Sequence, residues 1–402
     1  MEKERVLSDP LRGLLELGES EKEQRGLTYT PREIFQQPET WAATYLRCTE
    51  KSREITAFLR ESGVGASGGG PTVLLIGAGT SDYIGRSLAP LLRQRWGCEV
   101  WAVPSTDLLP NLGNYLTAGR KQLWISFSRS GDSSEGVAVL RKVLESYPEV
   151  RHLVVTCNAR GRMVEECSRN KERAYALVLQ DAVNDRGLAM TSSFSNMVIA
   201  GQCLAHYDDL ERYGGVVDDL SGAGKRLLPV GSRLALSLSH LNCAKACFVG
   251  SGALAAVASE CALKVLELTA GKVHTMAESA LGLRHGPMSA LDRNTLFVMF
   301  LSEGELRRKY ELDLLREICT KKLGKARALV APRQAAELGG LAEHVLTLDL
   351  PSAFGDEYRP PLDVMFGQLL GLFSSVNAGL RPDHPSPNGA ISRVVSHVNI
   401  YS

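Results

Sequence analysis

Residues 126–136 place several small hydroxyl side chains in one short loop, which reads SFSRSGDSSEG. The loop follows the apolar run QLWI and precedes VAVLRKVLES, whose apolar residues have helical spacing. A junction between a strand and a helix presents free backbone N–H groups and the positive end of the helix dipole. Because hydroxyls add donors and small residues let an anion approach closely, we expect this loop to bind phosphate. The expected donors are Ser128, Ser130, Ser133 and Ser134, and Gly131 permits the close approach.

An alternative interpretation is that these serines only cap the following helix and fill a turn. A second loop of small residues, GAGTS at 77–81, ends a neighbouring strand of the same half. Two such loops at the carboxyl edge of one parallel sheet favour a shared ligand site. GAGTS lacks the third glycine of a dinucleotide-binding motif in register, and no clear ribose-binding acidic residue follows the next strand. A nicotinamide cofactor is therefore not expected.

A second set of candidate residues lies within residues 262–287. Lys264 and Glu267 are three positions apart on an expected helix, so their side chains share one face. Glu278 is placed on a further helical stretch, and His285 lies in a turn just before a Gly-Pro pair. A carboxylate and a histidine are the groups that proton transfer and the opening of a sugar ring require. The alternative for the lysine and the first glutamate is a solvated ion pair without a catalytic role.

The elements that must position these residues alternate between short apolar runs and helical patterns. In the first half the apolar runs are TVLLIG, EVWAVPS, QLWIS, HLVVTCN and AYALVLQ. The half closes with the long helical pattern SSFSNMVIAGQCLAHY. Continuous apolar strands that alternate with helices are typical of a parallel sheet covered on both faces.

The same order of elements recurs in the second half. ACFVGSGALAAVASECALKVLEL resembles the first strand, loop and helix, and TLFVMFLSEGE resembles the strand with the serine loop. ARALVAP, HVLTLDL and PPLDVMFGQLLGLFSSVNAG follow in the corresponding order. The second half keeps only Ser302 and Gly304 in its loop, so phosphate is expected to bind in the first half alone. A helix within 205–240 is expected to connect the halves.

These patterns predict an α/β protein with three parts. Residues 1–50 look helical and form an N-terminal extension, residues 51–215 form the first α/β domain, and residues 216–402 form the second with a C-terminal tail. Each domain is expected to be a doubly wound parallel sheet flanked by helices.

Composition narrows the class of protein further. The 402 residues are 44% hydrophobic and 23% charged with a net charge of +1, which favours neither nucleic acid nor an anionic membrane as a partner. No apolar run reaches the length of a membrane span, and the N-terminus lacks the apolar core of a signal peptide. The nine cysteines form no C-x-x-C pair, which predicts reduced thiols and a cytoplasmic protein. No cluster of His and Cys has metal-ligand spacing, so neither a metal nor another cofactor is expected.

Four motifs together resemble the sugar isomerase (SIS) domain family: GAGTSDYIG, SFSRSGDSSEG, ESALGLRHGPMSALD and PSPNGAISRVVSHVNIY. The resemblance covers about residues 50–400. The layout is similar to the isomerase half of glutamine–fructose-6-phosphate transaminase. It is more similar to the tagatose-6-phosphate ketose/aldose isomerase group, which is also described as galactosamine-6-phosphate deaminase/isomerase. The resemblance implies two tandem SIS domains of flavodoxin-like topology, with a hexose or hexosamine 6-phosphate as substrate.

The resemblance also implies which residues hold the substrate. The phosphate-binding loops of the family match Ser81, Ser128, Arg129, Ser130 and Ser133, with Gly79 and Thr80 beside them. The loop at the start of the closing helix of the first domain points to Thr191 and Ser192 as further contacts.

For catalysis, the proton-transferring glutamate of the family matches Glu267, three residues after the matching Lys264. The ring-opening histidine matches His285, while Glu278 and Arg284 are further candidates for substrate contact. In related dimers this histidine comes from the neighbouring subunit. The resemblance therefore implies a homo-oligomer, either a dimer or a tetramer, with shared active sites.

One departure from the family pattern bears on the reaction. The transaminase uses a lysine of its C-terminal tail to form an imine with the ketose, whereas this sequence has no lysine after Lys325. The sequence also contains no glutamine amidotransferase domain. We therefore expect the catabolic direction, in which galactosamine 6-phosphate is converted to tagatose 6-phosphate and ammonia.

Three alternatives stay open at this point. The chain could be a plain aldose/ketose 6-phosphate isomerase or a glucosamine-6-phosphate deaminase, because both need the same groups. It could also be a regulator that senses a sugar phosphate, which would require neither Glu267 nor His285. The first fifty residues show no convincing helix-turn-helix and no basic stripe, which disfavours the regulator.

Overall fold

The computed structural model describes residues 9–66, 69–116, 119–395 and 398–401. The chain forms two compact units, each built from three segments. The first-sheet unit comprises Thr40–Asn184, Ser192–Val217 and Ser392–Ser402. The second-sheet unit comprises Met1–Glu39, Asp185–Thr191 and Asp218–Ile391. The expected N-terminal extension is thus divided between the two units, and its first eight residues lie outside the described part.

The first-sheet unit contains five parallel strands in the order β2-β1-β3-β4-β5. The strands are β1 (Thr72–Gly77), β2 (Val100–Pro104), β3 (Gln122–Ser128), β4 (Val150–Thr156) and β5 (Ala174–Val178). The helices that follow the strands are α7 (Thr80–Trp96), α8 (Ser105–Leu108), α9 (Ser134–Ser146), α10 (Arg162–Arg169) and α11 (Ser192–Ala205). Two earlier helices are α5 (Gln37–Glu50) and α6 (Ser52–Glu61).

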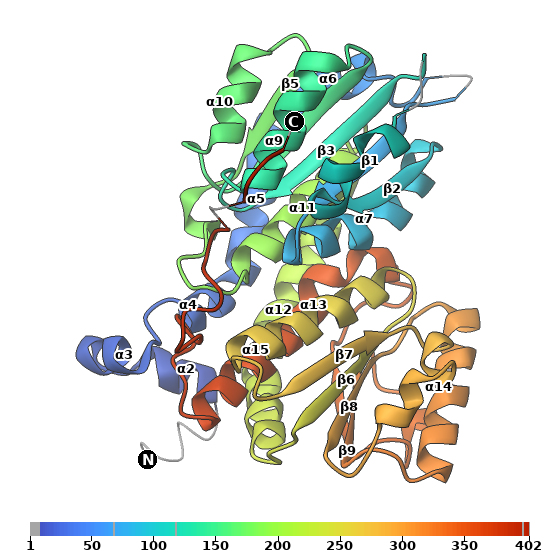
Figure 1. The fold of residues 1–402 in the computed structure, drawn as a ribbon. Coiled ribbons are helices and arrows are strands. Elements are labelled where there is room, and N and C mark those ends of the chain that lie inside the picture. Colours follow the sequence, from blue (N-terminus) through green and yellow to red (C-terminus); the bar gives the residue numbers. More distant parts are fainter. Residues whose placement is uncertain (1–8, 67–68, 117–118, 396–397, 402) are drawn as a thin grey trace. The chain divides into compact units, whose positions relative to one another are not determined.

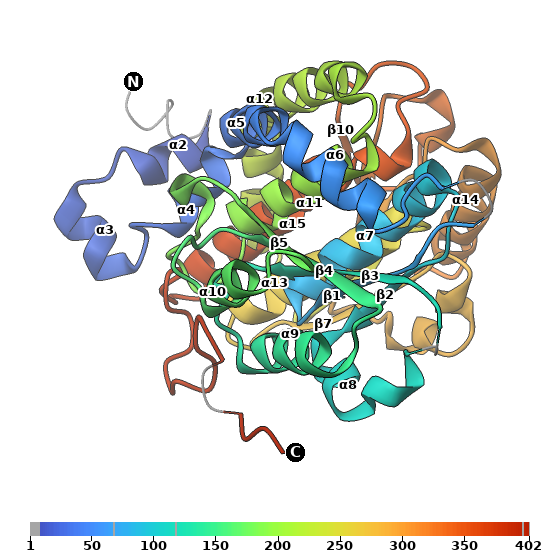
Figure 2. The same cartoon turned by 90° about the horizontal axis from the view of Figure 1, so that it is seen from above.

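Helices cover both faces of this sheet. Figure 2 shows α7 and α11 on one face and α8, α9 and α10 on the other. The central strand β3 is buried along its whole length, as expected for a strand between two layers of helices. Its Trp124 packs with Val139 and Val143 of α9, which are four residues apart and so lie on one face of that helix.

The second-sheet unit has five parallel strands in the order β10-β9-β8-β6-β7. The strands are β6 (Lys245–Val249), β7 (His274–Glu278), β8 (Thr295–Phe300), β9 (Ala326–Ala331) and β10 (His344–Thr347). The large helices are α13 (Ala253–Leu268), α14 (Glu305–Thr320) and α15 (Pro360–Asn377). Three short N-terminal helices precede them in sequence: α2 (Pro10–Leu15), α3 (Glu19–Arg25) and α4 (Thr30–Phe35). Helix α12 (Leu210–Ser239) lies where the sequence predicts the connecting helix.

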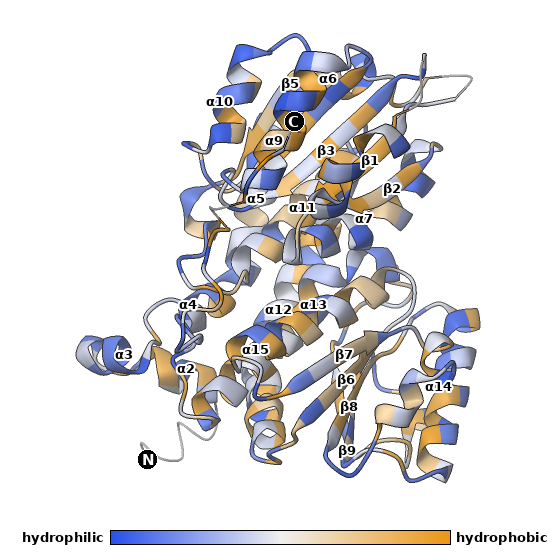
Figure 3. Ribbon diagram, in the orientation of Figure 1, coloured by the Kyte–Doolittle hydropathy of each residue, from blue (hydrophilic) through white to orange (hydrophobic). Residues whose placement is uncertain are grey.

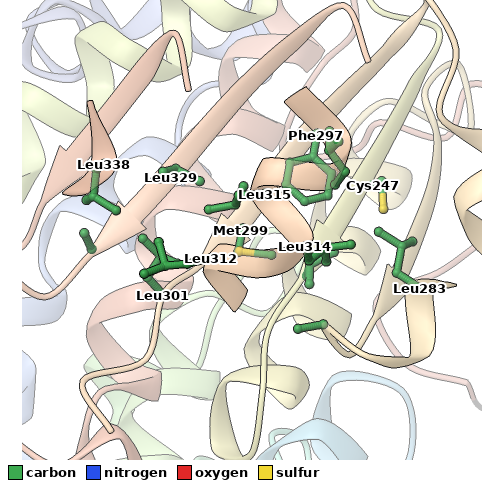
Figure 4. Packing of buried hydrophobic residues seen from close by; sticks show 14 of the residues in the cluster. Cys247, Leu283, Phe297, Met299, Leu301, Leu312, Leu314, Leu315, Leu329 and Leu338 are labelled. Atoms are coloured by element: carbon green, nitrogen blue, oxygen red, sulfur yellow. The ribbon is translucent and has the colours of Figure 1, made fainter. Parts of the chain in front are cut away.

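The core of the second-sheet unit lies on both faces of its sheet. On one face, Leu312, Leu315 and Ile318 of α14 pack against Phe297 and Met299 of β8 (Figure 4). Figure 3 shows both hydrophobic and hydrophilic residues along α14. On the other face, α13 and α15 pack against each other and α13 also contacts β6 and β7 (Figure 1).

The two sheets repeat one topology. In the first sheet, β1 lies between β2 and β3, and in the second sheet β6 lies in the same way between β7 and β8. Each sheet is therefore doubly wound, with a switch point between β1 and β3 and between β6 and β8. The turn after the first strand also repeats, since Gly79 and Gly252 have nearly the same backbone angles, φ 55° and ψ −123° against φ 60° and ψ −128°. The predicted fold class of two α/β halves is therefore confirmed.

One predicted element is wrong. Glu278 does not lie on a helical stretch, because it is the last residue of β7. This strand lies at the edge of its sheet, and its residues are exposed or only half-buried, so it lacks the apolar run that marks the central strands. Its Met, Ala and Glu residues also favour helices, which explains the wrong prediction.

None of the helices in the described residues has the length and apolar composition that a membrane span needs.

Candidate functional site

The two loops of small residues follow adjacent strands of the first sheet. Strands β1 and β3 pair in parallel, so the loops at 77–81 and 128–134 leave the same edge of the sheet. This edge is the carboxyl end of the strands at the switch point, where ligands of open α/β sheets bind. Thr80, Ser81, Ser128 and Arg129 are all buried there.

The turn after β1 requires glycine at Gly77. A Cβ atom at this position would lie 2.2 Å from the backbone carbonyl carbon of Ser81, a contact that no side chain can tolerate. The chain therefore folds back directly from the strand into α7, whose N-cap is Gly79. As a result Thr80 and Ser81 form the first turn of α7, where the helix dipole favours an anion.

Hydroxyl groups within the serine loop hold its own backbone. Ser128 Oγ accepts a hydrogen bond from Gly131 N at 3.1 Å, and Ser130 Oγ accepts one from Asp132 N at 3.2 Å. Each of these hydroxyls still has a proton to donate to another acceptor. Ser133 is the N-cap of α9, yet within the described residues its side chain makes no capping hydrogen bond. The alternative interpretation, in which the hydroxyl of Ser133 serves to cap the helix, is therefore not supported.

The neighbouring loop after β4 supports the serine loop. Asn158 Nδ2 donates to Ser130 O at 2.8 Å, and Met163 N donates to Gly131 O at 3.0 Å. Gly131 has a φ of +64°, and a Cβ there would lie 3.2 Å from Gly161 Cα. The loop thus has a fixed shape before any ligand arrives.

Arg129 contacts the C-terminal segment of the chain. One of its guanidinium nitrogens, Nη2, donates to the backbone oxygen of Arg393, and Arg393 Nη2 donates to Asn184 Oδ1 at 2.8 Å. Arg129 therefore joins the serine loop to residues of the tail. Its predicted contact with phosphate stays a prediction.

The corresponding loop of the second-sheet unit is filled by carboxylates of the chain itself. Glu303 N and Gly304 N donate to the two oxygens of Asp356 at 2.7 and 3.3 Å. Ser302 donates from its backbone N–H and its hydroxyl to the buried Glu311, at 2.8 and 2.7 Å. Burial opposes ionisation of Asp356, but Arg359 and these N–H groups keep its pKa below the usual value. A carboxylate of the chain itself thus accepts hydrogen bonds from the loop that corresponds to the predicted phosphate loop.

Helix α13 brings three charged side chains together. Glu260, Lys264 and Glu267 are spaced by four and three residues, so they share one face of the helix. Lys264 Nζ lies 3.4 Å from Glu260 Oε1 and 2.6 Å from Glu267 Oε2. Glu260 and Lys264 are fully buried, whereas the Glu267 side chain is 23% exposed. The interpretation of Lys264 and Glu267 as a solvated ion pair is therefore wrong.

The charge on Lys264 is maintained by its neighbours. Burial alone lowers the pKa of this ammonium group, but the two carboxylates outweigh that effect and raise the pKa above its ordinary value. The cluster therefore presents a permanent buried cation directly behind a carboxylate that reaches the surface of the unit.

The structure separates Glu278 and His285 from this cluster. Thr275 Oγ1 donates to Ala262 O at 2.8 Å, which places the start of β7 level with that point of α13. Because α13 runs antiparallel to β7, Glu267 lies about 7.5 Å below this level and Glu278 about 10 Å above it. Glu267 and Glu278 are thus about 17 Å apart along the strand direction, and His285 follows beyond the end of β7.

His285 and Arg284 follow the carboxyl end of β7, and only His285 is exposed. His285 is exposed in the short turn between two 3₁₀ helices, η3 (Gly282–Arg284) and η4 (Pro287–Ala290). Arg284 Nε donates to Glu317 Oε2 of α14 at 2.6 Å, so its guanidinium group is held by its own unit. The predicted contact of Arg284 with substrate stays a prediction.

Thr191 and Ser192 are buried at the start of α11. Thr191 donates from its backbone N–H to Asp185 Oδ2 at 2.7 Å and from its hydroxyl to Asp185 Oδ1 at 3.2 Å. Ser192 is the first residue of the helix, and its backbone oxygen accepts from Asn196 Nδ2 at 2.9 Å.

Within the described residues, no three His, Cys, Asp or Glu side chains gather in a way that could hold a metal ion.

Comparison with known proteins establishes the family. Residues 240–349 match the SIS domain family. A Streptomyces coelicolor protein named AgaS is 38% identical over 380 residues, which are 93% of this chain and 95% of that protein. D-galactosamine-6-phosphate deaminase AgaS of Escherichia coli is 33% identical over 381 residues, which are 93% of this chain and 96% of that protein. This chain belongs to the AgaS family.

A solved structure agrees with this assignment. The tagatose-6-phosphate ketose/aldose isomerase from Escherichia coli superposes with a TM-score of 0.83 and 31% sequence identity, over 93% of this chain and 96% of that chain. The AgaS family thus accounts for the tandem layout of the two sheets, and the predicted resemblance to SIS-domain sugar isomerases is confirmed.

Three functional candidates in this AgaS-family chain were missed at the level of sequence. Glu260 had a detectable signal, because it lies four residues before Lys264 on the same helix. Asp185 and Asp356 had none, because their partners are recognised only once the loops have folded.

Proposed function

We propose that this protein is a D-galactosamine-6-phosphate deaminase that releases tagatose 6-phosphate and ammonia. The observation that carries the proposal is the match over 93% of the chain to D-galactosamine-6-phosphate deaminase AgaS of Escherichia coli. The net reaction consumes one water, so it is a hydrolytic deamination coupled to an aldose–ketose isomerisation. The two loops after β1 and β3 and the charged cluster on α13 supply the groups that this chemistry needs.

The phosphate group is assigned to the loops of the first-sheet unit. Support comes from the helix N-terminus at Ser133, whose hydroxyl makes no capping bond within the described residues, and from the protons that Ser128 and Ser130 retain for donation. Ser81 lies in the first turn of the adjacent helix. These donors bind a phosphate oxygen by charge-assisted hydrogen bonds and thereby anchor the sugar.

Proton transfer is assigned to Glu267. In the open-chain amino sugar its carboxylate removes the proton at C2, which leaves an enolamine between C1 and C2. Return of the proton to C1 gives a ketimine at C2, and water then replaces the imine nitrogen, which leaves as ammonia. The buried ammonium of Lys264, 2.6 Å from Glu267 Oε2, supports this role because it fixes the carboxylate and offers positive charge beside the developing oxyanion.

Ring opening is assigned to His285 of a second copy of this chain, so the proposed enzyme is a homo-oligomer. Support comes from the separation of about 17 Å along the strand direction between Glu267 and the carboxyl end of β7, beyond which His285 lies. The histidine is exposed and therefore accessible to a neighbouring subunit. We place the protein in the cytoplasm, because its nine cysteines are free thiols.

A second candidate function is plain isomerisation of a hexose 6-phosphate. It is favoured by the superposition on the tagatose-6-phosphate ketose/aldose isomerase from Escherichia coli. This reaction needs the same base, ring-opening acid and phosphate anchor. It differs only in that C2 carries a hydroxyl group instead of an amine, so no ammonia is released.

The test is a substrate panel with two readouts. Purified protein is incubated with galactosamine 6-phosphate, glucosamine 6-phosphate or galactose 6-phosphate, and both ammonia and ketose are measured. Ammonia and tagatose 6-phosphate from galactosamine 6-phosphate alone would support the proposal. Ketose from galactose 6-phosphate, with no ammonia from either amino sugar, would favour the plain isomerase instead. The Glu267→Gln variant serves as the control for contaminating enzymes.

A further inference from the structure

The loop at 185–191 is closed by its own side chain and leads directly into α11. Asp185 accepts the two hydrogen bonds from Thr191 that were described above, so the first and last residues of the loop are joined. Gln368 Nε2 of α15 donates to Thr191 O at 3.3 Å. The position of Thr191, a candidate substrate contact, therefore depends on how this loop is held.

Glu33 of α4 holds the middle of the same loop. Its Oε1 accepts from Arg186 N at 2.5 Å and from Gly187 N at 3.3 Å, and the residue is 7% exposed. The packing is tight, since a Cβ at Gly187 would lie 2.8 Å from Thr30 Oγ1 and 3.0 Å from Glu33 Oε2. A side chain far away in sequence is thus fitted closely against the loop.

Asp383 fixes α4 and the loop to one another. Its carboxylate accepts from Thr28 N, Thr30 N and Thr30 Oγ1, each at 2.8 Å, and so holds the start of α4. Its backbone oxygen accepts from Leu188 N at 3.0 Å. The segment before α4, the loop and the segment after α15 therefore form one hydrogen-bonded assembly within the second-sheet unit.

Three carboxyl groups meet in this assembly. Burial, together with the nearby charges of Asp185 and Asp383, raises the pKa of Glu33 from its ordinary 4.5 to about 8, although the N–H groups of Arg186 and Gly187 act in the opposite direction. Asp185 faces Glu33 from the loop and Asp383 faces it from the segment after α15. At neutral pH Glu33 is therefore mostly protonated.

We propose that protonated Glu33 is a positioning residue that holds the loop at 185–191, and with it Thr191, in the geometry that the substrate requires, and that its ionisation loosens the loop. The part that concerns substrate rests on the proposed function. Ionisation places a third negative charge beside Asp185 and Asp383 in a buried site, which is unfavourable. The loop responds to this charge because Asp185, whose carboxylate closes the loop, is one of the two neighbouring charges.

The sign of the pH dependence follows from linkage. Glu33 has a pKa of 4.5 in the unfolded chain, and below this pH both the folded and the unfolded states hold its proton. The contribution of protonated Glu33 to the stability of the folded state is then fully present. The contribution is lost as pH rises toward about 8, because the unfolded chain releases the proton over this range while the folded chain must retain it. Above about pH 8 Glu33 ionises in the folded protein too, and the loop itself is affected.

Hydrogen–deuterium exchange measures the loop directly. Peptides that cover residues 185–191 are followed in the full-length protein without substrate, at about pH 6 and about pH 9, with rates divided by the intrinsic rate at each pH. In the wild-type protein the protection of this loop should fall by at least about fivefold over that range. In Glu33→Gln, which keeps the accepting oxygen but cannot ionise, protection should stay constant.

Two further variants complete the test. Asp185→Asn removes one of the neighbouring charges, so the loss of protection should occur at lower pH than in the wild type. Glu23→Gln changes an exposed carboxylate of α3 and should behave like the wild type. If the loop in Glu33→Gln loses protection with pH as the wild type does, the proposal is overturned.

Kinetics then separate this proposal from the proposed function. With galactosamine 6-phosphate, the wild-type KM should rise above about pH 8 more than that of Glu33→Gln, while kcat changes similarly in both. Absence of deamination together with a pH-dependent loop would refute the proposed function and leave the loop mechanism standing. Deamination together with a loop insensitive to pH would refute the loop mechanism alone.

Discussion

Asp356 accepts a hydrogen bond from the backbone N–H of Glu303 at 2.7 Å, in the loop that corresponds to the serine loop of the other unit. The carboxylate also pairs with Arg359, whose guanidinium group is fully buried and contacts Asp363 as well. An ion network of this kind fills the anion position of the second-sheet unit from within. The prediction of a phosphate site in the first-sheet unit alone agrees with this difference between the two loops.

The first prediction concerns the number of phosphate sites. Titration calorimetry with galactosamine 6-phosphate, using the Glu267→Gln variant to prevent turnover, should give one site per chain. Two sites per chain would show that Asp356 yields to the ligand. Asp356→Asn should leave this number unchanged but lower the free energy of unfolding by about 3 kcal/mol, because it leaves Arg359 with one carboxylate fewer in a buried site.

The second prediction concerns the serine loop. Ser133→Ala removes a hydroxyl that makes no capping bond, so it should raise KM by about tenfold or more, equivalent to about 1.5–3 kcal/mol, with little loss of stability. Ser128→Ala removes the acceptor for Gly131 N and should raise KM and lower the thermal unfolding midpoint together. An unchanged KM in Ser133→Ala, measured on the same phosphosugar, would refute the assignment of this loop to phosphate.

The third prediction concerns the charged cluster on α13. Glu267→Gln keeps the shape of the side chain but removes the base, so kcat should fall by about 100-fold or more while substrate still binds. Exchange of the C2 proton with deuterated solvent reports the same step without the later hydrolysis. Retained exchange at the wild-type rate would exclude Glu267 as the base.

Lys264 provides a fourth prediction, on stability. Lys264→Met removes the cation between two carboxylates and should cost about 3–5 kcal/mol, because Glu260 is fully buried. In the double variant Glu260→Leu/Lys264→Met the fully buried carboxylate and its cation are removed together, so part of this loss should be recovered. Urea unfolding of the wild type, the two single variants Glu260→Leu and Lys264→Met, and the double variant gives the coupling energy between Glu260 and Lys264. Simple additivity would show that the two groups do not depend on each other.

The fifth prediction concerns the origin of His285. When inactive Glu267→Gln and His285→Asn proteins are unfolded and refolded together, mixed dimers should regain one intact site, giving about a quarter of wild-type activity if assembly is random. The control mixes Glu267→Gln with the double variant Glu267→Gln/His285→Asn, which can form no intact site. Failure of the first mixture to recover any activity would place His285 in the site of its own chain or outside the reaction.

Much of this fold could be predicted because its signals are local. The glycine turn at Gly77 follows a buried strand, and the same order of elements occurs twice, which indicated two parallel sheets. The shared face of Lys264 and Glu267 also followed from helical spacing alone. These features depend on residues within one turn or one strand of each other, so the sequence displays them.

The remaining features depend on distant segments. Asp383 and Thr30 are 353 residues apart, and no periodicity links them. Strand β7 was not recognised because edge strands are stabilised by pairing on one side and need no continuous apolar run. The carboxylate that fills the second loop comes from Asp356, about fifty residues after Glu303, and could be found only in the folded chain.

The hydrogen bonds from α4 to Asp383 also have a consequence for the order of folding. During synthesis α4 emerges early, but the carboxylate that caps its first turn becomes available only after residue 383 has left the ribosome. The strands of the first sheet can pair much earlier in synthesis, because all of β1 to β5 lie between residues 72 and 178. The N-terminal helices of the second-sheet unit must therefore wait for almost the whole chain before this contact can form, and they stay accessible to chaperones and proteases until then.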